Sequence, residues 1–158
     1  MVARLFILSI LVMAPLCAGA ADLPKQGTDS YTIDFVAISS SSMKAGDHTV
    51  RTYESGGISR NDNGGPMFNN MGVRCIGMFE LAGNVATNRG TCIDTDKDGD
   101  EIFSTYEAKG MSGLHTFVGG TGKYAGITGT AEYTVEPVKS FDGTPMNIIR
   151  HKATWRLP

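Results

Sequence analysis

Short runs in which apolar and polar residues alternate recur along most of the chain, after a purely apolar stretch near its start. Alternation with a period of two is typical of half-buried β-strands, and helical spacing of apolar residues never persists beyond about two turns. Regular spacing of about eight such runs, separated by turns rich in Gly, Asn, Asp and Ser, predicts an all-β barrel or sandwich. The predicted strands cover residues 31–38, 48–54, 73–80, 90–93, 102–106, 114–118, 130–136 and 147–155, and a polar loop covers residues 61–70.

The apolar stretch at the N-terminus has the features of a secretory signal peptide. Arg4 precedes an apolar run from Leu5 to Leu16, and Ala18-Gly19-Ala20 supplies a small-residue cleavage site. The run is short for a membrane span, which makes an uncleaved N-terminal anchor the weaker alternative. We therefore predict that residues 1–20 are a signal peptide, that residues 21–158 form one domain, and that this domain is periplasmic or secreted.

Two cysteines, Cys75 and Cys92, remain once the predicted signal peptide is removed. If the chain reverses at Gly83-Asn84, the two stand at equal distances from the turn and face each other across antiparallel strands, where Cβ atoms approach to about 5 Å. In an oxidising compartment such a pair is most simply a disulfide, which would stabilise the fold by roughly 3 kcal/mol. Two buried thiols are an alternative; a metal pair is a poorer one, since no nearby histidine accompanies them.

The composition argues against several classes of partner. The formal net charge is −2 and the basic residues are scattered, so a nucleic acid is not expected to bind. No second long apolar segment follows the signal peptide, which predicts a mature domain without membrane contact. We expect neither a metal nor a cofactor.

A group of acidic residues resembles the start of a calcium loop. Asp94, Asp96 and Asp98 alternate along the chain before Gly99, but the bidentate glutamate that an EF-hand needs at its twelfth position is replaced by Thr105. Asp98-Gly99 between two predicted strands is also a strong hairpin signal. A structural turn is the favoured interpretation, and calcium binding is the alternative.

The segment Gly119-Gly120-Thr121-Gly122-Lys123-Tyr124, followed by Gly129, resembles the G-G-T-G-[KR]-[FY]-x-x-x-x-G motif of the dirigent and allene oxide cyclase-like β-barrels. The hairpin at residues 96–100 is similar to that of bacterial members, and the match is clear over residues 92–135. The resemblance implies an eight-stranded antiparallel barrel whose lumen holds a small apolar ligand. It carries no catalytic residue over to this chain, because a shared fold hosts many functions.

Four polar or aromatic side chains are candidates for ligand contact inside such a lumen: Tyr106, His115, His151 and Trp155. In the last predicted strand, His151 and Trp155 alternate with charged residues and share the apolar face. His115 shares its face with Phe117. The alternative for each histidine is a hydrogen-bonded core position, and for Tyr106 it is packing in the barrel wall.

Three functions remain open at the level of the sequence. The leading hypothesis is an exported barrel that binds an apolar or amphipathic small molecule, oriented by the candidate side chains. The second is a cyclase or isomerase that confines a reactive substrate in the same lumen. The third is a structural interaction module of the cell envelope, which would need an exposed apolar patch rather than a cavity.

Overall fold

The computed structural model describes residues 23–140 and 142–158 of the chain, so the predicted signal peptide, residues 1–20, lies outside the described residues. No helix in these ranges is long and apolar enough to cross a membrane. The described residues form eight strands and one 3₁₀ turn: β1 (Gln26–Ala45), β2 (His48–Asn61), β3 (Met71–Ala82), β4 (Val85–Thr95), β5 (Glu101–Lys109), β6 (Ser112–Gly120), η1 (Gly122–Tyr124), β7 (Thr128–Val138) and β8 (Met146–Arg156).

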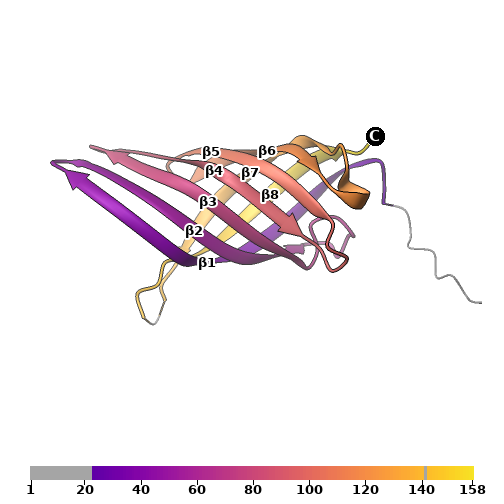
Figure 1. Ribbon diagram of the computed structural model, residues 1–158, viewed down its shortest axis with the longest axis horizontal. Helices are drawn as coiled ribbons and strands as arrows, with labels where there is room; N and C mark the ends of the chain where they lie inside the picture. Colours follow the sequence, from indigo (N-terminus) through magenta and orange to yellow (C-terminus); the bar gives the residue numbers. More distant parts are fainter. Residues whose placement is uncertain (1–22, 141) are drawn as a thin grey trace, which may run out of the picture.

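The eight strands close into a single antiparallel barrel (Figure 1). Each strand pairs with the next one in the sequence, and β8 returns to pair with β1, from Gln26 opposite Arg156 to Val36 opposite Met146. Closure leaves no sheet edge along the paired length, which a two-sheet sandwich would retain. The predicted all-β class and eight-stranded barrel are confirmed, and the sandwich alternative is wrong.

The alternation of apolar and polar residues in the sequence corresponds to lumen-facing and outward-facing positions in the barrel. In β8, His151, Ala153 and Trp155 are buried in the lumen, whereas the intervening Lys152 and Thr154 are exposed. Successive side chains of a strand point to opposite faces of a sheet, so a closed sheet buries every second residue. Burial of the apolar set is the main force that fixes the register of each strand.

β1 is much longer than the predicted strand over residues 31–38, because it changes its partners along its length. Beyond Val36 it loses β8 but stays paired with β2 as far as Ala45 opposite His48. The distal parts of β1–β4 therefore project past the rim of the barrel, as Figure 1 shows at the tips of these strands. We call residues 41–52 and 78–89 the β1–β4 extension.

The opposite end of the barrel is filled by the loop between β2 and β3. This loop was expected to be polar, yet it carries Met67 and Phe68 into the lumen, where they are 1% and 0% exposed. The Phe68 ring stacks on Tyr31 at 4.4 Å between centroids and on Phe117 at 5.4 Å. Met67 and Phe68 thus form a plug that completes the core.

A chain of polar side chains holds the plug loop in place. Asn61 donates from Nδ2 to the carbonyl oxygen of Met67 at 2.9 Å and to Asp29 Oδ1 at 2.8 Å. Its Oδ1 accepts from the backbone N–H of Asn63 and of Gly65. Asp29 Oδ2 in turn accepts from Trp155 Nε1 at 2.6 Å. These bonds satisfy the side-chain amide of Asn61, which is necessary because it is buried.

Candidate functional site

The end of the barrel opposite the plug contains a cavity of about 330 Å³. Its entrance lies between the β1–β4 extension, which contributes Arg51 and Phe79, and the two loops that contribute Met111 and Pro145. The walls are mainly apolar and include Phe35, Val135 and Ile149. A volume of this order is at the small end of the range for small-molecule sites.

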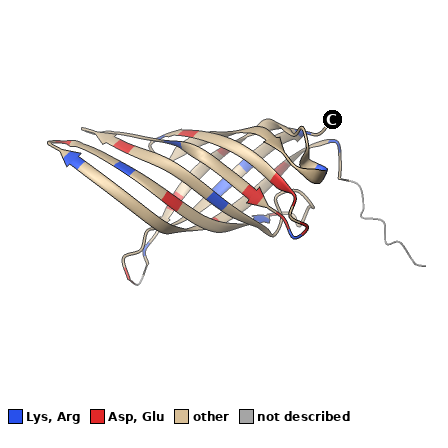
Figure 2. Ribbon diagram, in the orientation of Figure 1, with Lys and Arg blue, Asp and Glu red and all other residues tan. Residues whose placement is uncertain are grey.

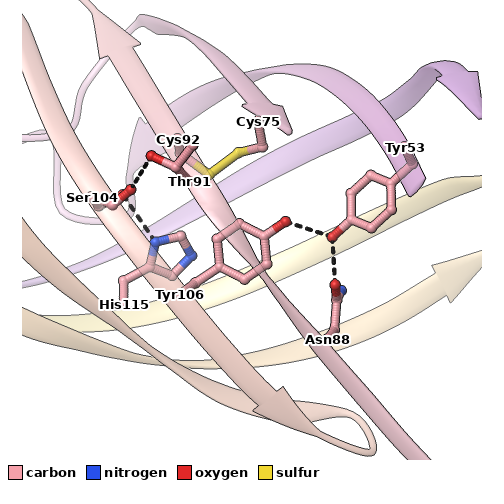
Figure 3. The surroundings of a disulfide bond; sticks show 8 residues. All are labelled: Tyr53, Cys75, Asn88, Thr91, Cys92, Ser104, Tyr106 and His115. Atoms are coloured by element: carbon pink, nitrogen blue, oxygen red, sulfur yellow. Dashed lines mark hydrogen bonds between the residues drawn. A yellow bond between two sulfur atoms is a disulfide. The ribbon is translucent and has the colours of Figure 1, made fainter. Parts of the chain in front are cut away.

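Two tyrosines, Tyr53 of β2 and Tyr106 of β5, meet inside the cavity (Figure 3). The hydroxyls of Tyr53 and Tyr106 are 2.6 Å apart, and the Tyr53 hydroxyl donates to Asn88 Oδ1 at 2.8 Å. A phenol has one proton, so Tyr106 must donate to Tyr53. The Tyr106 oxygen therefore keeps the capacity to accept a hydrogen bond from a bound molecule.

Two glycines make room for this tyrosine pair. Gly77 and Gly90 lie opposite each other on β3 and β4, in the row between Tyr53 and Tyr106. A Cβ atom on either glycine would overlap the Tyr106 hydroxyl, and one on Gly77 would also lie 2.7 Å from the Tyr53 hydroxyl. The phenol rings can cross the lumen only because the wall beneath them has no side chains.

His115 lines the cavity next to Tyr106, with 5.2 Å between the ring centroids. Its Nδ1 is 3.1 Å from Ser104 Oγ, as Figure 3 shows. Burial lowers the pKa of His115 to about 4, because a low-dielectric site disfavours the charged ring. At neutral pH the cavity thus presents a neutral imidazole beside two protonated phenols.

His151 lies against His115, with 5.2 Å between ring centroids, but it does not line the cavity. Its ring stacks on Tyr31 at 4.3 Å, and within the described residues neither ring nitrogen has a hydrogen-bond partner. Burial first, and the neighbouring His115 second, lower the pKa of His151 to about 3. His151 is therefore a neutral ring beneath the cavity.

Trp155 lies farther from the cavity than the other three candidates. It is six residues beyond the cavity-lining Ile149 on β8, which corresponds to about 20 Å along the strand, and its indole binds Asp29 at the plugged end. The structure thus brings Tyr106 and His115 together at the cavity, places His151 directly beneath them, and leaves Trp155 with the plug. A ligand contact by any of the four stays a prediction.

Cys75 and Cys92 form a disulfide and face each other directly across β3 and β4, with 4.1 Å between their Cα atoms. The predicted pairing is confirmed, and the alternatives of free thiols or a metal pair are wrong. Both cysteines line the cavity next to the tyrosine pair (Figure 3). A disulfide of this kind points to an oxidising environment.

Asp94 is a carboxyl group that faces the lumen, two residues beyond Cys92 on β4, and is 6% exposed. Burial raises its pKa to about 7. In the turn that follows β4, three further carboxylates lie around the side chain of Lys123. The Lys123 ammonium pairs with Asp96, lies 2.7 Å from Asp98 and 3.8 Å from Asp100.

The acidic residues of the β4–β5 turn, seen in red in Figure 2, thus surround a cation that the chain itself supplies from η1 and that offsets part of their charge. Tyr124, next to Lys123, is buried and donates to Asp96 Oδ2 at 3.1 Å. The Gly-Gly-Thr-Gly-Lys-Tyr segment therefore fastens η1 to the turn. No group of three potential metal ligands occurs in residues 23–140 and 142–158.

Several cavity residues were absent from the sequence-based candidates, among them Arg51, Tyr53, Asn88 and Tyr133. Gly77 and Gly90, which face each other on β3 and β4, offered a signal for Tyr53 and Tyr106, since a glycine inside a strand often marks the close approach of another group. Arg51 gave no signal, because a lone arginine in an alternating strand is ordinarily a solvent-exposed residue.

Neither family models nor curated proteins match the sequence. Among solved structures, the fold is similar to that of the pterocarpan synthase dirigent protein GePTS1, with a TM-score of 0.53 and 12% identity over 94% of this chain and 98% of that chain. A second pterocarpan synthase dirigent protein, PsPTS1, is 11% identical over 85% of this chain and 97% of its own, with a TM-score of 0.48. The chain therefore has the eight-stranded barrel fold of dirigent proteins.

Proposed function

We propose that this protein is an exported β-barrel that binds an apolar or amphipathic small molecule in its lumen. The observation that carries the proposal is the cavity itself, which combines apolar walls with a few converging polar groups, Tyr106 and His115 among them. The core of the barrel is otherwise closed by the plug at Met67 and Phe68. The dirigent-type fold supports a lumen site but does not identify its occupant.

Thermal unfolding with a neutral lipophilic probe, 6-phenylhexan-1-ol, tests the lumen site. A ligand that binds only the folded state stabilises it by about 2.7 kcal/mol at a concentration of 100 times its Kd. Val135→Trp, which fills the cavity, should abolish the rise in Tm. Val118→Trp is the matched control, because Val118 is 60% exposed on the outer wall. If the probe leaves the Tm of the wild-type protein unchanged, the proposal is wrong.

Export is the second part of the proposal and rests on the predicted signal peptide at residues 1–20 and on the disulfide. The protein recovered from the periplasm or culture medium of its own host should begin at Ala21 and contain no titratable thiol. Native mass spectrometry of the same material would show a retained ligand as added mass. A full-length protein in the cytosol with two reactive thiols would contradict export.

An isomerase or cyclase is the second candidate function, and the adjacent Tyr106 and His115 favour it. A protonated phenol and a neutral imidazole in one confined site can stabilise developing charge on a substrate and take up a proton. Tyr106→Phe and His115→Gln should then abolish turnover of a cavity-bound substrate while preserving its affinity within a few-fold. Unchanged turnover in both variants would leave binding as the function.

A further inference from the structure

The entrance of the cavity carries one cation. Among the described residues that line the cavity, Arg51 alone has a formal charge at neutral pH; no aspartate or glutamate lines it, and His115 is neutral. Arg51 stands on β2 in the row that contains Phe79 of β3 and Asn88 of β4, both of which also line the cavity. Arg51 therefore lines the entrance from the position directly opposite Phe79, among mainly apolar residues.

The charge of Arg51 is not balanced by the protein within the described ranges. Three other arginines have carboxylate partners: Arg60 binds Asp34, Arg74 binds Glu54 and Arg150 binds Glu136. Arg89 and Arg156 form no ion pair among the described residues either, but neither of them lines the cavity. The carboxylate of Glu80, one residue along β3 from Phe79, binds His48 instead. Arg51 forms no ion pair with any residue from 23 to 140 or 142 to 158, although acidic and basic residues are scattered over the strands (Figure 2).

On this basis, and given the lumen site proposed above, we infer that the ligand is an amphipathic organic acid whose carboxylate binds Arg51 at the entrance. A planar guanidinium offers two parallel N–H donors to a carboxylate, and such charge-assisted pairs are stronger where water is partly excluded. A single positive charge beside low-dielectric walls also attracts anions toward the entrance.

The dimensions of the cavity set the form of this acid. Arg51 and the cavity-lining Ser55 are four residues apart on β2, about 13 Å along the strand. Tyr53 lies between them, and the adjoining Tyr106 oxygen is free to accept one hydrogen bond. The ligand thus has a carboxylate, an apolar body of about ten atoms in length that contacts Phe35 and Ile149, and room for a hydroxyl donor to Tyr106.

Three probes with one apolar body test the charge preference: 6-phenylhexanoate, 6-phenylhexan-1-ol and 6-phenylhexylammonium. Calorimetric titration of the wild-type protein should show the acid binding at least tenfold more tightly than the alcohol, and the amine most weakly. Arg51→Gln should remove the preference for the acid and leave the affinity for the alcohol within about twofold. Arg51 is exposed at the entrance, so circular dichroism and Tm should show an intact fold.

Arg89→Gln is the matched control, because Arg89 is an exposed arginine on the outer face of β4, one residue from the cavity-lining Asn88. It should keep the full preference for the acid. Equal affinity of the wild-type protein for acid and alcohol would overturn this inference and leave the lumen site standing. Failure of all three probes to bind would overturn the lumen site, and the inference with it. An acid preference that survives Arg51→Gln would also refute the role of Arg51.

Discussion

Replacing Gly77 with alanine tests whether the contact between Tyr53 and Tyr106 depends on the absence of a side chain at this position. Gly77 has no positive φ, so alanine suits its backbone and would ordinarily stabilise a strand by about 0.4–1 kcal/mol. Here the new methyl group would overlap the Tyr106 hydroxyl and crowd Tyr53. Overpacking of a core costs about 1–3 kcal/mol, and loss of the hydrogen bond between the phenols about 1 kcal/mol. We expect Gly77→Ala to lower the free energy of unfolding by about 2–4 kcal/mol.

The matched control for this substitution is Gly72→Ala on the same strand. A Cβ there would have only one neighbour, the carbonyl oxygen of Thr95 at 3.9 Å, so stability should stay the same or rise slightly. Urea unfolding followed by the fluorescence of Trp155, the single tryptophan, measures both variants. Equal stability of Gly72→Ala and Gly77→Ala would refute the reasoning.

A double variant makes the test specific to the overlap. Tyr106→Phe removes the oxygen that the Gly77 methyl group would meet, so Gly77→Ala should cost less in the Tyr106→Phe background than in the wild type. Because the residues are in contact, a coupling energy of at least about 1 kcal/mol is expected. Strict additivity of the two substitutions would show that the methyl group and the phenol do not compete for the same space.

Three further predictions concern stability. Replacing both Cys75 and Cys92 with alanine should lower the free energy of unfolding by about 3 kcal/mol, measured by urea titration, since the crosslink closes a loop with a sequence separation of 17; an unchanged midpoint would contradict this. The folded-state pKa of Asp94, about 7, exceeds its unfolded value of about 3.9, so its contribution is fully present below pH 4 and is lost as pH rises through 7. Between pH 4 and 8 the free energy of unfolding of the wild-type protein should therefore fall by up to about 4 kcal/mol relative to that of Asp94→Asn. The effect of the two buried histidines cancels in this comparison, because both proteins contain them. A difference in unfolding free energy that does not change with pH would refute the prediction. Lys123→Met should lower the Tm by a few degrees and Lys97→Met should not, because the Lys123 ammonium joins η1 to the acidic turn, whereas Lys97 pairs only with Asp98 within that turn; equal melting temperatures would contradict this.

The sequence predicted the faces of the strands well and the positions along the barrel axis poorly. Alternation places His151 and Trp155 on the lumen side of one strand, and both are buried there. Alternation contains no information about position along the barrel axis, because every second residue of a strand faces inward both at the open end and at the plugged end. Grouping Trp155 with Tyr106 therefore joined a residue at the plugged end with a residue of the cavity.

The disulfide was predictable because one tight turn fixes the register of a hairpin, and Cys75 and Cys92 stand symmetrically about the turn at Gly83. Long-range features escaped prediction for physical reasons. Phe68 and Asn70 adopt positive φ where the plug loop turns into the core. Such a turn has no periodic pattern of apolar residues from which it could be predicted. The contact of Tyr53 with Tyr106 depends on the register of three strand pairs across β3 and β4, which no single hairpin specifies.

The distal half of β1 has one further consequence. Past Ala37, whose N–H still donates to the carbonyl oxygen of Pro145, its outer edge presents backbone N–H and C=O groups that no strand among residues 23–140 and 142–158 covers. An uncovered edge of this kind invites neighbouring molecules to add strands and form aggregates. The run Ser39-Ser40-Ser41-Ser42 and the charge of Lys44 keep this edge hydrated. These polar side chains weaken that tendency, although Ile38 and Met43 on the same segment are 58% and 75% exposed. They also interrupt the apolar alternation, which is why the sequence predicted only residues 31–38 of this strand.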